Sequence, residues 1–106
     1  MAETTFHALI VDFVDDAPQA QIKTIPLSAL PAGDVLIKVD YSSLNYKDGL
    51  AVTGKGKIIR QYPMVPGIDL AGTVVESNDS RFREGDPVVV TGWGLGERHW
   101  GGYAQY

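Results

Sequence analysis

Alternation of apolar and polar positions predicts several short strands in this chain. The clearest case is residues 35–41, where the odd-numbered positions are apolar or aromatic and share one face, opposite Leu36, Lys38 and Asp40. Further strands are expected at residues 6–13, 21–25, 70–76 and 87–91, with the start of another at 103–106. The first two are expected to pair as a hairpin through a turn at residues 15–18, which contain two aspartates and a proline.

One helix is predicted, over residues 42–53. Asn45 or Ser43 could cap its N-terminus, Asp48 would favour its first turn, and Gly54 would end it. The segments between these elements are rich in glycine, proline and polar residues and are read as turns and loops. Six or seven short strands with one short helix predict a mainly β fold, a small barrel or sandwich.

Composition narrows the class of protein. The length of 106 residues predicts one domain over residues 1–106, and 12 glycines with 6 prolines suit a turn-rich β fold. A net charge of −4 argues against a nucleic-acid partner. The lack of cysteine excludes disulfides, cysteine–zinc clusters and a thiol nucleophile. No apolar run is long enough to span a membrane and no signal peptide is evident, so no membrane partner and a cytoplasmic location are expected.

Residues 64–75 are the stretch around which the chain is expected to be organised. Pro66 cannot continue a helix, and Gly67 after it makes a turn. Gly72, without a Cβ, allows close approach of another backbone or a ligand. Asp69 is a carboxylate beside an apolar run, so it must be paired, hydrogen-bonded or functional.

Two glycine-containing loops have some features of phosphate-binding motifs. The series Gly92-x-Gly94-x-Gly96 fails as a dinucleotide fingerprint, because its spacing is wrong and no amphipathic helix follows. Residues 54–57 resemble a phosphate loop only loosely, and the plain interpretation is a solvated turn. The functional interpretation is that Lys55, Lys57 and Arg60, the only basic concentration in an acidic chain, contact a phosphorylated ligand.

Residues 42–48 and the two tryptophans carry the other candidate chemistry. Asn45 offers a donor and an acceptor and Tyr46 a hydroxyl, although the residues by themselves favour helix capping and core packing of Leu44 and Tyr46. Trp93 and Trp100 could be packing residues or the wall of an apolar ligand cleft. His7 and His99 show no metal-ligand spacing, and no metal site is predicted.

Taken together, these motifs resemble those of the N-terminal catalytic domain of the medium-chain dehydrogenase/reductase superfamily. Pro66-Gly-Ile-Asp-Leu-Ala-Gly-Thr-Val74 and Arg83-Glu-Gly-Asp-Pro-Val-Val89 resemble its signatures. Residues 42–48, 53–60 and 91–102 are similar to the acrylyl-CoA reductase group, also called quinone oxidoreductases. The resemblance implies a GroES-like, partly open β-barrel, paired in the intact enzyme with an NADPH-binding Rossmann domain that residues 1–106 do not contain.

The resemblance also implies a mechanism without zinc. Zinc-dependent relatives place cysteine where Asn45 stands and His-Glu where Ile68 and Asp69 stand. The implied reaction moves a hydride from NADPH to an alkene activated by a thioester or a quinone-like carbonyl. It implies that Asn45 and Tyr46 lie at the nicotinamide as catalytic and cofactor-binding residues. Asp69 would hold the turn by hydrogen bonds, together with the structural residues Pro66, Gly67 and Gly72.

The same resemblance suggests weaker substrate contacts. Lys55, Lys57 and Arg60 would meet phosphates of CoA, and Trp93 and Trp100 would line the substrate site. The isolated 106 residues are expected to be inactive, and a surface left without its Rossmann partner could drive homo-oligomerisation. The alternative is a free-standing GroES-like binding or co-chaperonin module, which suits the length, whereas the motif at residues 42–48 favours the enzyme.

Overall fold

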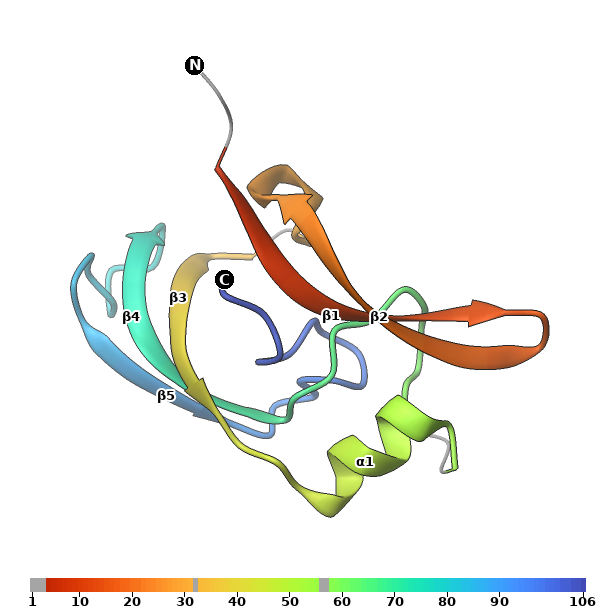
Figure 1. Ribbon diagram of the computed structural model, residues 1–106. Coiled ribbons are helices and arrows are strands. Elements are labelled where there is room, and N and C mark those ends of the chain that lie inside the picture. The colour runs from red at the N-terminus through yellow and green to blue at the C-terminus, as the bar shows by residue number, and fades with distance from the viewer. Residues whose placement is uncertain (1–3, 32, 56–57) are drawn as a thin grey trace.

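The computed structural model describes residues 4–31, 33–55 and 58–106 of the chain. Two antiparallel sheets make up the mainly β fold, and they do not close into a continuous barrel (Figure 1). One is the ribbon β1–β2, and the other has the strand order β3–β4–β5. The elements are β1 (Thr5–Val14), β2 (Ala17–Pro26), the 3-10 helix η1 (Leu27–Ala29), β3 (Val35–Ser42), α1 (Tyr46–Thr53), β4 (Asp69–Ser77) and β5 (Pro87–Thr91). The predicted partly open β fold with one α-helix is confirmed.

The β1–β2 hairpin turns in two residues rather than the four that were predicted. Val14 pairs with Ala17, and both Asp15 and Asp16 have positive φ angles, 50° and 62°. Two left-handed residues in succession match the twist of the flanking strands, and aspartate tolerates this conformation better than most residues. As a result β2 begins at Ala17, four residues earlier than the pattern indicated.

The simple alternation expected along residues 35–41 is wrong in β3. The pairing of β3 with β4 is irregular between Leu36 and Ile37 and again between Val39 and Tyr41. Each irregularity resets which face the next side chain occupies. Leu36 therefore lines a largely apolar cavity together with Val35, Ile37 and Val39, which are half-buried, whereas Tyr41 is exposed.

The chain end at residues 103–106 was expected to begin a strand, but it forms only one isolated bridge, from Ala104 to Ala8. This segment nevertheless joins the two sheets. The Gln105 N–H donates to the His7 carbonyl on β1 at 3.1 Å, and the Gln105 carbonyl accepts from the Val39 N–H on β3 at 2.8 Å. In Figure 1 the C-terminal segment runs between β1 and β3.

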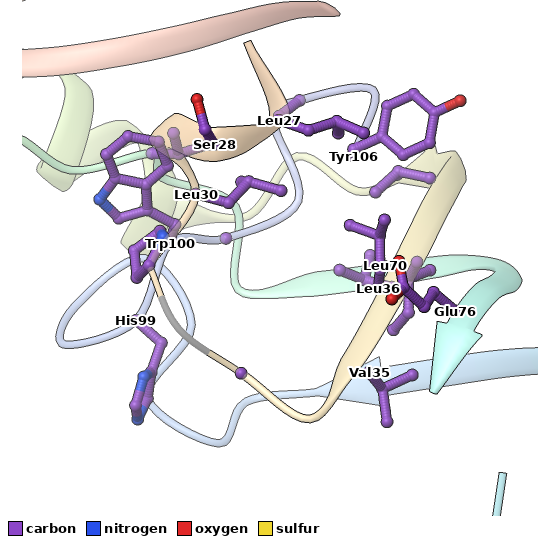
Figure 2. Close-up of a pocket in the computed structure, with 17 residues that line it drawn as sticks. Leu27, Ser28, Leu30, Val35, Leu36, Leu70, Glu76, His99, Trp100 and Tyr106 are labelled. Carbon is purple, nitrogen blue, oxygen red and sulfur yellow. The ribbon is translucent and has the colours of Figure 1, made fainter. Parts of the chain in front are cut away.

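Trp100 connects the two parts of the hydrophobic core. It packs against one cluster that contains Phe6 and Val65 and against a second that contains Val11 and Met64. Beside it lies a cavity of about 620 Å³. Figure 2 shows Trp100 on one side of this cavity and Leu36 of β3 on the other. Most of the side chains that line the cavity are apolar, and Asn45 and Tyr46 are not among them.

Gly72 provides a test of the packing between β3 and β4. A Cβ at this position would collide with the Lys38 carbonyl and would lie 2.7 Å from Ile37 Cγ2. Gly72→Ala is therefore expected to lower the free energy of unfolding by about 2–3 kcal/mol. The measurement is urea denaturation followed by far-UV circular dichroism.

Gly49 supplies the matched control. It lies inside α1, and a Cβ there would meet nothing within 4 Å. Gly49→Ala should raise the free energy of unfolding by about 0.5–1 kcal/mol, because alanine loses less backbone entropy in a helix. Equal effects at the two glycines would contradict the close approach described for Gly72.

Candidate functional site

The candidate site lies where three strands and the helix meet at one end of the β3–β4–β5 sheet. Ser42 at the end of β3 pairs with Leu70, and Asp69 at the start of β4 pairs with Thr91 at the end of β5. The α1 helix begins four residues after β3 ends, with Asn45 as its N-cap. Antiparallel pairing therefore brings residues 42–48, 68–70 and 91–93 to a single corner.

A buried carboxylate, Asp48, holds this corner together. Its side chain is only 1% exposed. Asp48 Oδ2 accepts the backbone N–H of Asn45 at 3.2 Å, as in a capping box, and Oδ1 accepts the backbone N–H of Ile68 at 3.0 Å. One side chain thus ties the first turn of α1 to the entry of β4.

The side-chain amide of Asn45 is oriented by this carboxylate and by a second one. Asn45 Nδ2 lies 2.8 Å from Ser43 Oγ, 3.1 Å from Asp48 Oδ2 and 3.5 Å from Asp69 Oδ2. A carboxylate only accepts hydrogen bonds, so the NH₂ end of the amide must face the two aspartates. The orientation of the Asn45 amide plane is consequently set before any ligand arrives.

Asp69 reaches the third strand of the corner. Its Oδ2 accepts from the Ser43 hydroxyl at 3.2 Å, and its Oδ1 accepts the backbone N–H of Gly92 at 3.2 Å. Its own carbonyl accepts from Ser42 Oγ at 2.7 Å. The side chain therefore links the loops that follow β3 and β5, and no basic side chain forms an ion pair with it among the described residues.

The Pro66–Gly67 turn packs against the C-terminal segment. Gly67 has a φ of 103°, and a Cβ there would lie 2.8 Å from the backbone nitrogens of Gly102 and Tyr103. These two N–H groups donate to the carbonyls of Gly67 and Pro66 at 2.9 and 3.0 Å. Pro66, Gly67 and Gly72 are all buried.

Three large apolar or aromatic side chains stand exposed around this polar network. Leu44 is 87% exposed, Tyr46 is 85% exposed and Trp93 is 84% exposed. Leu44 and Tyr46 flank Asn45 in sequence, and Trp93 follows Gly92, whose N–H binds Asp69. The interpretation of Leu44 and Tyr46 as core residues is therefore wrong. The three side chains are called the apolar rim below.

The other candidate residues have different surroundings. Trp100 packs in the core and donates its indole N–H to the Pro63 carbonyl at 3.1 Å, so it does not share the environment of Trp93. Gly54, which precedes Lys55, packs near the Pro18 side chain at the β1–β2 ribbon. Arg60 instead donates its backbone N–H to the Glu97 carbonyl at 2.8 Å. Lys57 lies outside the described residues.

Tyr103 contributes a contact that sequence reasoning missed. Its hydroxyl donates to the Ser43 carbonyl at 3.0 Å. Burial and the nearby charge of Asp48 raise the pKa of the Tyr103 hydroxyl to about 12. The sequence predicted Asp48 only as a residue that favours the first turn of the helix. The spacing of Asn45 and Asp48 is typical of a capping box, so this part of its role could have been predicted. The hydrogen bond between Asp48 and Ile68 could not, because the two residues are distant in sequence.

No group of three or more potential metal ligands is present in the described part of the chain. Within the same residues, no helix has the length and apolar character needed to cross a membrane.

The chain matches the model of the alcohol dehydrogenase GroES-like domain over residues 31–106. The chain belongs to this family. It is 52% identical over 102 residues to an acrylyl-CoA reductase of Ruegeria pomeroyi, an alignment that covers 94% of this chain and 31% of the relative. The chain thus spans about a third of the length of that enzyme.

Solved structures give the same family assignment. An oxidoreductase of Salmonella enterica in complex with NADP is 57% identical, with a TM-score of 0.90 over 93% of this chain and 31% of that one. A Bacillus subtilis protein with NAD bound is 50% identical, with a TM-score of 0.91 over 96% of this chain and 31% of that one. The GroES-like fold and the placement in the medium-chain dehydrogenase/reductase superfamily, predicted from the motifs, are confirmed.

Asp48→Ala tests how far the corner depends on its buried carboxylate. The substitution leaves the N–H groups of Asn45 and Ile68 without this acceptor. We expect it to lower the free energy of unfolding by about 2–4 kcal/mol in denaturant titration. Asp40→Ala, at an exposed aspartate on β3, should change the value by no more than about 0.5 kcal/mol. If Asp48→Ala lowered the free energy of unfolding no more than Asp40→Ala does, the Asp48 hydrogen bonds would not hold the corner together.

Tyr103 predicts a specific alkaline dependence of stability. The ordinary pKa of 10.0 holds in the unfolded chain, whereas the folded value is about 12. The contribution of the protonated Tyr103 hydroxyl to the free energy of unfolding is therefore fully present below pH 10 and is lost as the pH rises to 12. In Tyr103→Phe this part of the decline should vanish, which unfolding titrations across that range can measure. Parallel curves for the two proteins would contradict the assignment.

Proposed function

We propose that this chain is the substrate-side catalytic domain of an NADPH-dependent oxidoreductase that reduces an activated carbon–carbon double bond. The observation that carries the proposal is the Asn45 amide, locked by Asp48 and Asp69 beside the exposed apolar rim. A polar group whose orientation is set in advance, next to unpacked aromatic surface, is typical of a ligand site. The names of the relatives support an oxidoreductase.

The residues of this chain fit one end of the cofactor. The exposed ring of Tyr46 offers a face on which the nicotinamide can lie, and its hydroxyl has no hydrogen-bond partner among the described residues. The glycine-rich loop after β5, which lies wholly within the described residues, offers no comparable cradle for the phosphates of a dinucleotide. Gly94 and Gly96 lie in successive turns closed by their own backbone hydrogen bonds, and no helix follows them. NADPH would thus meet this domain at its nicotinamide end.

When bound, NADPH supplies a hydride to the substrate. Asn45 contributes a fixed hydrogen-bonding plane at the nicotinamide, and no reorganisation is needed to present it. The Tyr46 hydroxyl can bond to the cofactor. Leu44 and Trp93 would exclude water from the reacting atoms, which strengthens every hydrogen bond to an oxygen that gains negative charge.

The substrate class follows from the rim and from the relatives. A conjugated enoyl group or a quinone ring is flat and apolar, and therefore suits contact with Leu44 and Trp93. The relative in Ruegeria pomeroyi is named an acrylyl-CoA reductase. An enoyl thioester such as acrylyl-CoA is accordingly the first substrate to test, with a simple quinone as the second.

A chimera tests this function. Residues 1–106 would replace the matching third of the Ruegeria pomeroyi reductase, and oxidation of NADPH would be followed with acrylyl-CoA and with a quinone. Asn45→Ala in the chimera should lower kcat/KM by about 100-fold, and Tyr46→Phe should raise the KM for NADPH by about five-fold. Tyr41→Phe, at an exposed tyrosine of β3 outside the corner, is the matched control and should change neither value.

The outcome that would overturn the proposal is a chimera that folds and binds NADPH but oxidises it no faster with either substrate. Unchanged kinetics in both Asn45→Ala and Tyr46→Phe would remove these residues from the site, whatever the activity of the parent chimera.

A further inference from the structure

A basic cluster lies next to the candidate site. Lys47, the residue after Tyr46 on α1, places its Nζ 2.9 Å from Glu97 Oε2. The charges of Lys47, Arg60 and Arg98 together lower the pKa of the Glu97 carboxyl, with the hydrogen bond from Lys47 as the largest cause. Three cations from three separate segments therefore lie close enough to one carboxylate for their charges to act on it. Lys47, Arg60 and Arg98 are called the basic cluster below.

The basic cluster has an excess of positive charge that its own carboxylate does not cancel. Glu97 is bonded to Lys47, and its side chain is only 20% exposed. Arg60 and Arg98 are both exposed, and their charges act on the same carboxylate. Three positive charges against one negative charge leave an excess of two in a chain whose net charge is −4. Such a local excess attracts anions.

The segments that carry the two arginines are fixed to each other. The Arg60 N–H donates to the Glu97 carbonyl at 2.8 Å, and Gln61 Nε2 donates to the Arg98 carbonyl at 2.9 Å. Arg98 also packs over Gly94, where a Cβ would lie 3.4 Å from its Nε. Two arginines held on tied segments lose less freedom on binding an anion than two on independent loops would.

We infer that the basic cluster binds the phosphate groups of a CoA-type substrate while the thioester end reaches Asn45 and the apolar rim. This inference rests on the proposed function. Arginine pairs with phosphate through two parallel hydrogen bonds, which favours Arg60 and Arg98 as the main contacts. NADPH is the other source of phosphate, and helix N-termini of a Rossmann domain, rather than this cluster, bind its pyrophosphate.

The first experiment titrates the isotopically labelled 106-residue chain with free CoA, with pantetheine, which has the same arm without phosphate, and with NADP⁺. CoA should shift the amide resonances of Arg60, Glu97 and Arg98, and pantetheine should shift them far less. Arg60→Gln and Arg98→Gln should each weaken CoA binding roughly two- to five-fold, and added salt should weaken it further.

Two further variants test whether the charge of the basic cluster determines the affinity for CoA. Glu97→Gln removes the negative charge inside the basic cluster and should tighten CoA binding by roughly two- to five-fold. A purely structural role for Glu97 would weaken binding instead. Arg83→Gln, at an exposed arginine in the turn before β5, is the matched control and should leave the affinity for CoA unchanged.

The inference is overturned if CoA and pantetheine shift the same resonances equally, or if CoA shifts none of them. It is also overturned if the arginine substitutions weaken the binding of NADP⁺ but not that of CoA. In the chimera, Arg60→Gln with Arg98→Gln should raise the KM for acrylyl-CoA and leave turnover of a phosphate-free quinone unchanged. A chimera that folds and binds NADPH but is inactive with both substrates would refute the proposed function, whereas the CoA titration would still decide whether the basic cluster binds phosphate.

Discussion

The buried carboxylate of Asp48 is the constraint on which the candidate site depends. A charge taken out of water is tolerated only where hydrogen bonds replace its hydration. Here the replacement comes from the N-cap of α1, the entry of β4 and the Asn45 amide. The need to satisfy one carboxylate therefore fixes the helix relative to the sheet and orients Asn45 at the same time.

The polar groups of the corner are bonded to one another, whereas its apolar side chains are exposed to solvent. The Asp48–Asn45–Asp69 network is internally satisfied, and no buried side-chain polar atom in the described residues is left without a partner. Leu44, Tyr46 and Trp93 are exposed beside it, although burying each would be favourable by about 1.5–3 kcal/mol. A rigid polar base with an unburied apolar rim is the arrangement expected of a surface that acquires a ligand or a covering domain.

Particular residues show which features the local sequence pattern can predict and which it cannot. Three features could be predicted because each depends on neighbours in the chain: Asn45 as the N-cap of α1, Gly54 as its left-handed C-cap, and the hairpin of β1 with β2. Tyr41 and Tyr46 were misjudged, since the β3 irregularities and the position of the helix on the sheet decide their exposure. The three basic candidates of residues 55–60 were grouped by sequence proximity, whereas the fold groups Arg60 with Lys47 and Arg98.

The sequence alone determined the class of fold and the family, and it singled out Asn45 and Tyr46 as candidate site residues. This was possible because turn glycines, prolines and helix caps act over a few residues, and because the family motifs are contiguous in the chain. Only the tertiary structure decided what those residues touch. It brought Asp69 and Asp48 to one amide, separated Trp93 from Trp100, and gathered the basic cluster around Glu97. Asn45 and Asp69 are 24 positions apart, and the basic cluster comes from three separate segments. The hydrogen bonds and burial that select such long-range contacts have no counterpart in the local pattern.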